Sequence, residues 1–112
     1  MAVERLEVVF RRDAADDLDA IYRWIYEASL DPVTAERYVG RIVAYCEKIG
    51  GMARGGRPRD DLLPGLRTFP FEGRAVIAYL IVGDRVEITN VFHGGRDYEA
   101  LYRGEPDNVD ER

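Results

Sequence analysis

The chain has 112 residues, a net charge of -5 and a hydrophobic share of 46%. This length fits one domain that buries roughly two-thirds of its unfolded surface and folds without disulfides. The single cysteine, Cys46, excludes an internal disulfide and a cysteine-ligated metal cluster, and it is typical of a reducing compartment. Charges at Glu4, Arg5 and Glu7 argue against a signal peptide, and no apolar run approaches the ~20 residues of a membrane helix. We therefore expect a cytoplasmic protein without membrane contact.

Charge is distributed unevenly along the chain. Residues 1–50 hold ten acidic and seven basic side chains, and residues 51–103 hold seven acidic side chains and eight arginines. Residues 104–112 add four acidic side chains and one arginine. A net negative chain is a poor general binder of nucleic acid, because the phosphates repel it. The arginine-rich second half still allows a local anion-facing patch, but we expect no sequence-specific DNA binding.

The N-terminal part predicts a strand and then a helix. Residues Leu6–Phe10 alternate in polarity, as a half-buried strand does. Asp13 is expected to be the N-cap of the helix, since carboxylates favour the positive end of the helix dipole. Trp24 faces away from the expected core stripe and Tyr26 widens the apolar face, so both are candidates for a partner surface. The stripe itself consists of Ala14, Leu18, Ile21, Ile25 and Ala28.

A second helix is predicted to begin at Asp31-Pro32, an N-cap followed by proline at the first helical position. Gly50-Gly51 is expected to end it as a C-terminal glycine cap. The link between the two helices is short, which predicts an antiparallel helical hairpin. The buried face of the second helix is expected to contain Ala35, Tyr38, Val39, Ile42, Cys46 and Ile49.

The rest of the chain predicts three strands, at Leu66–Phe71, Arg74–Val82 and Arg85–Phe92. Gly83-Asp84 suits a type II′ turn between the last two, and Pro70 indicates an edge position or a bulge. A short helix is expected at Asp97–Tyr102. The order β-α-α-β-β-β is typical of the α+β class, with an antiparallel sheet and a two-helix hairpin packed on one face. Residues 1–103 are expected to form one domain, and the acidic tail 104–112 is expected to be disordered.

Ordered motifs over residues 6–102 resemble the ParE/RelE toxin superfamily. They are Ala14-x-x-Asp17-Leu18-x-x-Ile21, Pro64-Gly65-Leu66-Arg67, Ile77-Ala78-Tyr79, Val86-Glu87-Ile88 and Val91-Phe92-His93-Gly94-Gly95-Arg96-Asp97. The resemblance implies a type II toxin, of the kind linked to plasmid stabilization, that a cognate antitoxin neutralises. ParE-like members inhibit DNA gyrase and pair with ParD-type, ribbon-helix-helix antitoxins. RelE-like members cut messenger RNA on the ribosome.

The ParE-like branch is favoured by the long helical hairpin and by the acidic net charge, which would steer poorly to the ribosome. By resemblance, a RelE-like ribonuclease would use Arg67, Arg96 and Tyr102, with Arg74 as a partial substitute. Apolar residues stand where that branch presents two further basic side chains, namely Phe69 and Val76. We therefore expect a gyrase-binding inhibitor rather than an enzyme, with the metal-free endoribonuclease as the alternative.

Contact with a target or the antitoxin is the expected role of seven side chains. His93 is either a structural residue or a general base, and Arg96 either contacts a phosphate or forms an ion pair. Arg67 and Arg74 either face an acidic partner or are solvated strand residues. No metal site or cofactor is expected, because one histidine and scattered acids offer no ligand spacing. The contact candidates are Trp24, Tyr26, Arg67, Arg74, His93, Arg96 and Tyr98.

Overall fold

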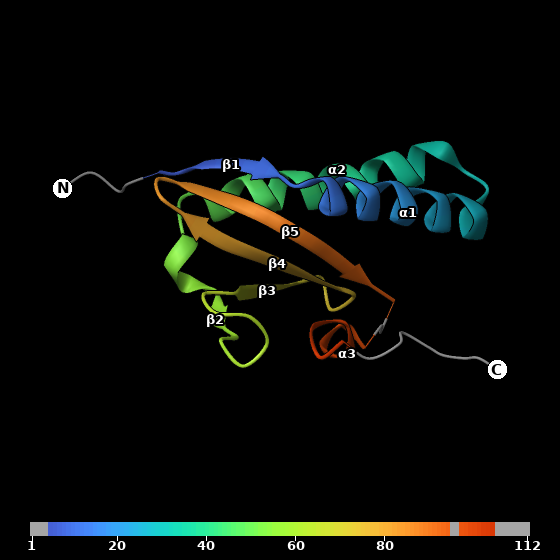
Figure 1. Ribbon diagram of the computed structural model, residues 1–112. Helices are drawn as coiled ribbons and strands as arrows, with labels where there is room; N and C mark the ends of the chain where they lie inside the picture. The colour runs from blue at the N-terminus through green and yellow to red at the C-terminus, as the bar shows by residue number, and fades with distance from the viewer. Residues whose placement is uncertain (1–4, 95–96, 105–112) are drawn as a thin grey trace.

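A computed structural model describes residues 5–94 and 97–104, and it confirms the α+β class. Within these residues a five-stranded sheet has the order β1-β5-β4-β3-β2, and two long helices lie against it (Figure 1). None of the helices in the described residues combines the length and the hydropathy of a membrane-spanning segment. The elements are β1 (Glu7–Phe10), α1 (Arg12–Ser29), α2 (Pro32–Ile49), β2 (Arg57–Pro58), β3 (Arg67–Phe71), β4 (Ala75–Val82), β5 (Arg85–His93) and α3 (Tyr98–Tyr102).

The sheet is mixed rather than purely antiparallel. Strands β2 to β5 pair antiparallel, as expected, but β1 pairs parallel with β5 in the register Glu7↔Arg85 to Phe10↔Ile88. A parallel pair needs a long connection, and here the helical hairpin and three strands separate the two partners. The alternation of residues in β1 shows that it is a strand, but it carries no information about the direction of its partner.

Helix α1 begins two residues earlier than a cap at Asp13 would allow. Its N-cap is Arg11, which makes no side-chain cap. The Arg11 N–H donates to the Ile88 carbonyl at 2.9 Å, so strand pairing runs directly into the helix. The expected Asp13 cap is therefore wrong, and Asp13 lies in the first turn, where its charge still favours the helix dipole. For α2 the expectation is confirmed, since the Asp31 carboxylate accepts from the Val33 N–H at 3.1 Å.

The main core lies between the helical hairpin and one face of the sheet. The expected face of α2 is confirmed, with Val39 only partly buried. On α1 the stripe is buried at Ala14, Ile21 and Ile25, but Ala28 is exposed because it lies close to the free end of the hairpin. The largest fully buried side chains of this core are Tyr79, Ile42, Ile49, Ile77, Ile88 and Val86.

A second, smaller core covers the opposite face of the sheet. Leu66, Ala78 and Phe92 are buried there, and Tyr98 and Tyr102 of α3 pack against them. Helix α3 begins with Asp97 as its N-cap and ends at Tyr102, so the expected short helix is confirmed. Because β4 and β5 are buried on both faces, both covers are needed to remove their apolar side chains from water.

Three turn and edge predictions can be compared with the backbone. Gly83 has a φ of 61°, as a type II′ turn requires at its first central position. Pro70 lies on the part of β3 that β2 does not pair, so its edge position is confirmed. Gly50 caps α2 with a φ of -56°, not in the left-handed region. A side chain there would collide with the Leu6 carbonyl, so close approach explains this glycine.

Tyr79 links β4 to the 3-10 turn Ala53–Gly55 through its hydroxyl group. Removal of this hydroxyl tests how much the link stabilises the main core. Its hydroxyl donates to the Ala53 carbonyl at 2.6 Å and accepts from the Gly56 N–H at 3.1 Å. Tyr79→Phe leaves both backbone groups buried without a partner, so we expect a loss of about 1–3 kcal/mol in the free energy of unfolding, measured by urea denaturation.

Tyr45→Phe is the matched control. Tyr45 packs on Phe69 and Phe71 through its ring, and within the described residues its hydroxyl has no hydrogen-bond partner. We expect almost no change for this variant. Equal losses for the two variants would contradict a specific role of the Tyr79 hydroxyl.

Candidate functional site

An aromatic cluster lies where the helical hairpin crosses the end of β5. The Trp24 ring of α1 meets the His93 ring edge-on, with centroids 4.9 Å apart. The Tyr38 hydroxyl of α2 forms a hydrogen bond of 3.0 Å with His93 Nε2. Tyr38 is buried, whereas Trp24 is 53% exposed. His93 thus joins a buried tyrosine to an exposed tryptophan.

Charged side chains border this cluster on the β3–β4 side. Arg41 lies over the Tyr38 ring, 5.2 Å from its centroid, and pairs with both Glu72 carboxylate oxygens at 2.9 and 3.0 Å. Arg74 immediately precedes β4, whose first residue, Ala75, is the register partner of His93. We call Trp24, Tyr38, Arg41, Arg74 and His93 the Trp24 surface.

The electrostatic environment keeps the hydrogen-bonded side chains of Tyr38 and His93 neutral near pH 7. Burial lowers the pKa of His93 below its ordinary value of 6.5, and the positive charge of Arg74 lowers it further. Burial also raises the pKa of Tyr38, and the nearby Glu72 carboxylate adds to that rise. A neutral His93 in this position is suited to packing and hydrogen bonding, which favours the structural interpretation of this residue.

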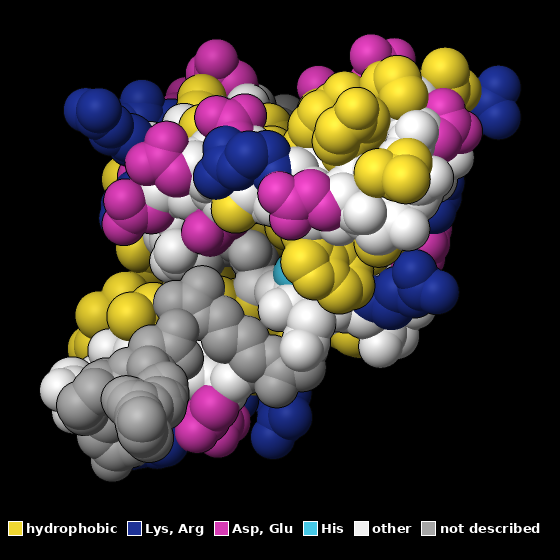
Figure 2. Space-filling view, turned by 90° about the vertical axis from the view of Figure 1, so that its right-hand side faces the viewer, with side chains coloured by type: hydrophobic (Ala, Val, Ile, Leu, Met, Phe, Trp, Pro, Cys, Tyr) yellow, Lys and Arg dark blue, Asp and Glu magenta, His cyan; other side chains and the backbone are white. Residues whose placement is uncertain are grey.

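Three shallow hollows adjoin the Trp24 surface. One of about 320 Å³ lies between α1 and α2, with Trp24, Tyr38, Arg41 and Arg74 in its lining. A second of about 250 Å³ lies on the other side of Trp24, against His93. A third, of about 280 Å³, lies beyond Arg74 on the β3–β4 side. Figure 2 shows hydrophobic side chains gathered over this end of the molecule, with Lys or Arg side chains beside them.

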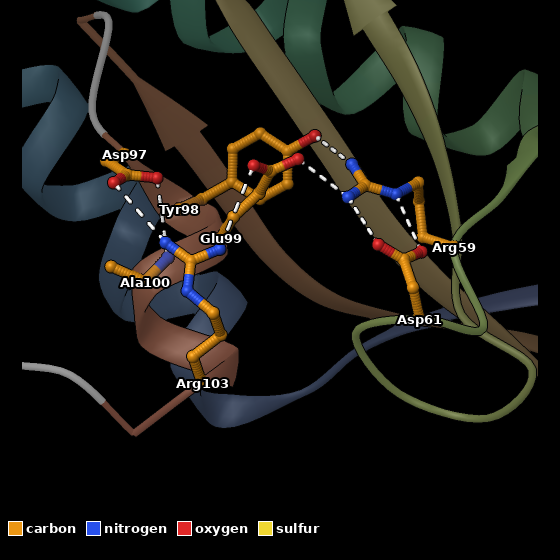
Figure 3. A network of polar contacts seen from close by, with 7 residues as sticks. All are labelled: Arg59, Asp61, Asp97, Tyr98, Glu99, Ala100 and Arg103. Carbon is orange, nitrogen blue, oxygen red and sulfur yellow. Dashed lines mark hydrogen bonds and ion pairs between the residues drawn. The ribbon is translucent and has the colours of Figure 1, made fainter.

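Tyr98 lies in a different network, which attaches α3 to the sheet (Figure 3). The buried Arg59 guanidinium donates to the Tyr98 hydroxyl at 3.1 Å and pairs with Asp61 at 2.8 Å and with Glu99 at 2.6 Å. These two carboxylates raise the pKa of Arg59. The Tyr98 hydroxyl is bound by Arg59, and the Tyr98 ring stacks on Phe92 near the end of β5. Tyr98 therefore holds α3 against the end of β5.

The side chains proposed for a ribonuclease do not converge in the described structure. Arg67 pairs in register with Tyr79, five residues along β4 from Arg74, or roughly 17 Å of strand. The Arg67 guanidinium donates to the carbonyls of Arg54 and Gly56, which stabilises the 3-10 turn. Tyr102 is packed on the opposite face of the sheet from the helical hairpin. Arg96 lies outside the described residues.

The other contact candidates divide between the Trp24 surface and positions elsewhere. The structure brings Trp24, His93 and Arg74 together, whereas Tyr26 is exposed on α1 and lines none of the three hollows. Arg41 and Tyr38 were not predicted as members of the Trp24 surface, because their contacts with Glu72 and His93 join residues 31 and 55 positions apart. In the described ranges, no three His, Cys, Asp or Glu side chains lie close enough to hold a metal ion.

Comparisons with known proteins agree on one family. Residues 8–98 match the family model described as the ParE toxin of the type II toxin-antitoxin system, parDE. The chain is 33% identical to Toxin ParE3 of Caulobacter vibrioides over 93 residues, which cover 83% of this chain and 91% of that protein. It is also similar to a solved structure of the chromosomal ParDE TA system from P. aeruginosa. That match has a TM-score of 0.68 and 27% identity and covers 80% of this chain and 97% of the other.

The titration of His93 tests the geometry of the cluster. Because the folded state disfavours the imidazolium, the unfolded chain takes up the proton first as the pH falls through about 6.5. The free energy of unfolding should therefore decrease from about pH 6.5 down to the folded pKa, and His93→Gln should remove this part of the pH dependence. His93 is the chain's only histidine, so an NMR titration reads its pKa directly.

Arg74→Gln should move the His93 pKa upwards, since it removes the positive charge and leaves the burial. Arg54→Gln, in the 3-10 turn, is the control and should leave it unchanged. A midpoint at or above the ordinary value of 6.5 in the unsubstituted protein would contradict the cluster as described.

Proposed function

The chain belongs to the ParE toxin family of type II toxin-antitoxin systems, and from this membership we propose that it inhibits DNA gyrase and is neutralised by a ParD-type antitoxin. The matched residues, 8–98, include both long helices and nearly the whole sheet. In this proposal the toxin acts in the cytoplasm by binding, and its antitoxin carries a ribbon-helix-helix domain and a segment that covers the toxin.

The exposed apolar end of the helical hairpin is the observation that carries the proposal of a covering antitoxin. Trp24 is 53% exposed, Val33 47% and Leu30 76%. Apolar side chains gathered in this way mark a protein-binding surface, and exposed tryptophans are frequent anchors of such interfaces. A partner segment that lies along α1 would bury them and fill the hollows on both sides of Trp24.

The endoribonuclease alternative gains no support from the described residues. Phosphodiester cleavage without a metal needs cationic and proton-transferring groups around one phosphate. Here Arg67 stabilises a backbone turn, Tyr102 lies on the other face of the sheet, and Arg74 lies five residues along β4 from the register partner of Arg67. The arrangement is better suited to a binding protein.

Supercoiling of relaxed plasmid by purified gyrase tests the target directly. We expect the free toxin to inhibit supercoiling in a dose-dependent way, and an equimolar amount of antitoxin to restore it. Undisturbed supercoiling at toxin excess would reject gyrase as the target. In that case, cleavage of a translated message in the ribosomal A site would support the ribonuclease.

Trp24→Ala tests the antitoxin surface. Truncation of a central aromatic anchor costs about 2 kcal/mol or more, so we expect the antitoxin to bind at least about 30-fold more weakly in calorimetry. Val82→Ala is the control, because Val82 is 40% exposed at the opposite end of β4. Equal affinities of the Trp24→Ala and Val82→Ala variants would place the antitoxin elsewhere.

A further inference from the structure

We propose that Arg74 selects the antitoxin by pairing with a carboxylate on its covering segment, next to an apolar side chain seated between Trp24 and Tyr38. This inference rests on the proposed function, because it assumes that an antitoxin segment occupies the Trp24 surface. It adds the chemistry of that segment, its direction along α1 and the toxin residue that recognises it.

The hollow between α1 and α2 provides the apolar part of the site. Its floor includes the buried Ile25, and Trp24, Ala28 and Tyr38 contribute further apolar surface. Its volume of about 320 Å³ equals the space of roughly ten water molecules, enough for one large side chain. An apolar side chain that displaces this water gains the free energy of leaving solvent.

The two hollows beside Trp24 have the spacing of a helical partner. Ala20 lines the hollow on the His93 side, Ala28 lines the one on the Tyr38 side, and Trp24 lines both. These three residues are four positions apart on α1, so each step is about 6 Å. Apolar side chains four residues apart on an antitoxin helix have the same spacing and would enter the two hollows together.

Arg74 is the cation left available at this site. Arg41 is already paired with both oxygens of Glu72, whereas within the described residues Arg74 makes no ion pair or hydrogen bond through its side chain. The positive charge of Arg74 acts on the groups around the hollow, because it lowers the pKa of His93 and of Glu72. An arginine beside an apolar hollow favours a carboxylate, which it binds through two parallel hydrogen bonds.

The charged side chains beside the two hollows determine in which direction the partner segment lies along α1. Asp17 lines the hollow on the His93 side, where its carboxylate accepts from the Val91 N–H at 2.9 Å. A second carboxylate is disfavoured there by repulsion, while Arg74 attracts one at the other end. The partner segment should therefore carry its acidic residue at the end that lies near Arg74 and Tyr38.

The test measures binding of the antitoxin encoded beside this chain's gene, by calorimetry at low and moderate salt. Arg74→Gln should weaken binding 10- to 100-fold, as expected for the loss of one charge-assisted pair, and should reduce the dependence on salt. Arg74→Lys should lose less, because it keeps the charge but not the two parallel hydrogen bonds. Arg54→Gln is the control and should bind like the unsubstituted protein.

A double-mutant cycle then identifies the carboxylate. Each Asp and Glu of the antitoxin's covering segment is changed to its amide and tested against the unsubstituted toxin and Arg74→Gln. One substitution should weaken binding to the former and leave binding to the latter unchanged. Matching thermal unfolding of the two toxins shows that the Arg74→Gln chain is folded.

Five results would overturn the inference. Unchanged affinity of Arg74→Gln, or no coupled carboxylate, refutes it while the proposed function stands. Loss of gyrase inhibition without loss of antitoxin binding assigns Arg74 to the gyrase contact instead. A dimer of the free toxin that Arg74→Gln dissociates makes a second copy the occupant. Failure of the unsubstituted toxin to bind the antitoxin refutes the inference and the proposed antitoxin together.

Discussion

Strands β4 and β5 are buried on both faces, and this burial determines where the helices lie. Two strands of this composition are stable in water only if each face has its own cover. The helical hairpin covers one face, and α3 with the segment before β3 covers the other. With 18 residues in each helix, about 27 Å of length, the hairpin extends beyond the end of the sheet (Figure 1). The overhanging end has no sheet beneath it, which explains why its apolar side chains remain exposed.

Several arginines near the sheet have partners within the described part of the chain, which explains why an acidic chain with many arginines need not be a nucleic-acid binder. Arg11 and Arg85 both pair with the buried Glu87 carboxylate, whose pKa they lower. Arg59 attaches α3, and Arg67 stabilises the 3-10 turn. Arg59 and Arg67, both in the arginine-rich second half that suggested a basic patch, are thus used inside the molecule to fix α3 and the 3-10 turn.

The sequence predicted those features that depend on neighbouring residues. The apolar spacing of both helices, the Asp31-Pro32 start and the Gly83-Asp84 turn are local, and the structure confirms them. Features set by distant segments were not predictable. The start of α1 depends on a hydrogen bond from Arg11 to Ile88, and the parallel direction of β1 depends on where β5 lies. The same holds for the site, because Tyr38 and His93 are 55 positions apart and nothing local links them.

An antitoxin that covers the surface around Trp24 should shield the Trp24 ring from solvent. Trp24 is the chain's only tryptophan, so its fluorescence reports on this surface without interference from other toxin residues. The most direct measurement is acrylamide quenching of Trp24 in the free toxin and in its complex with an antitoxin in which any tryptophan is replaced. We expect a shift of the emission to shorter wavelength and a marked loss of quenching in the complex. Unchanged emission and quenching in a fully formed complex would contradict this expectation.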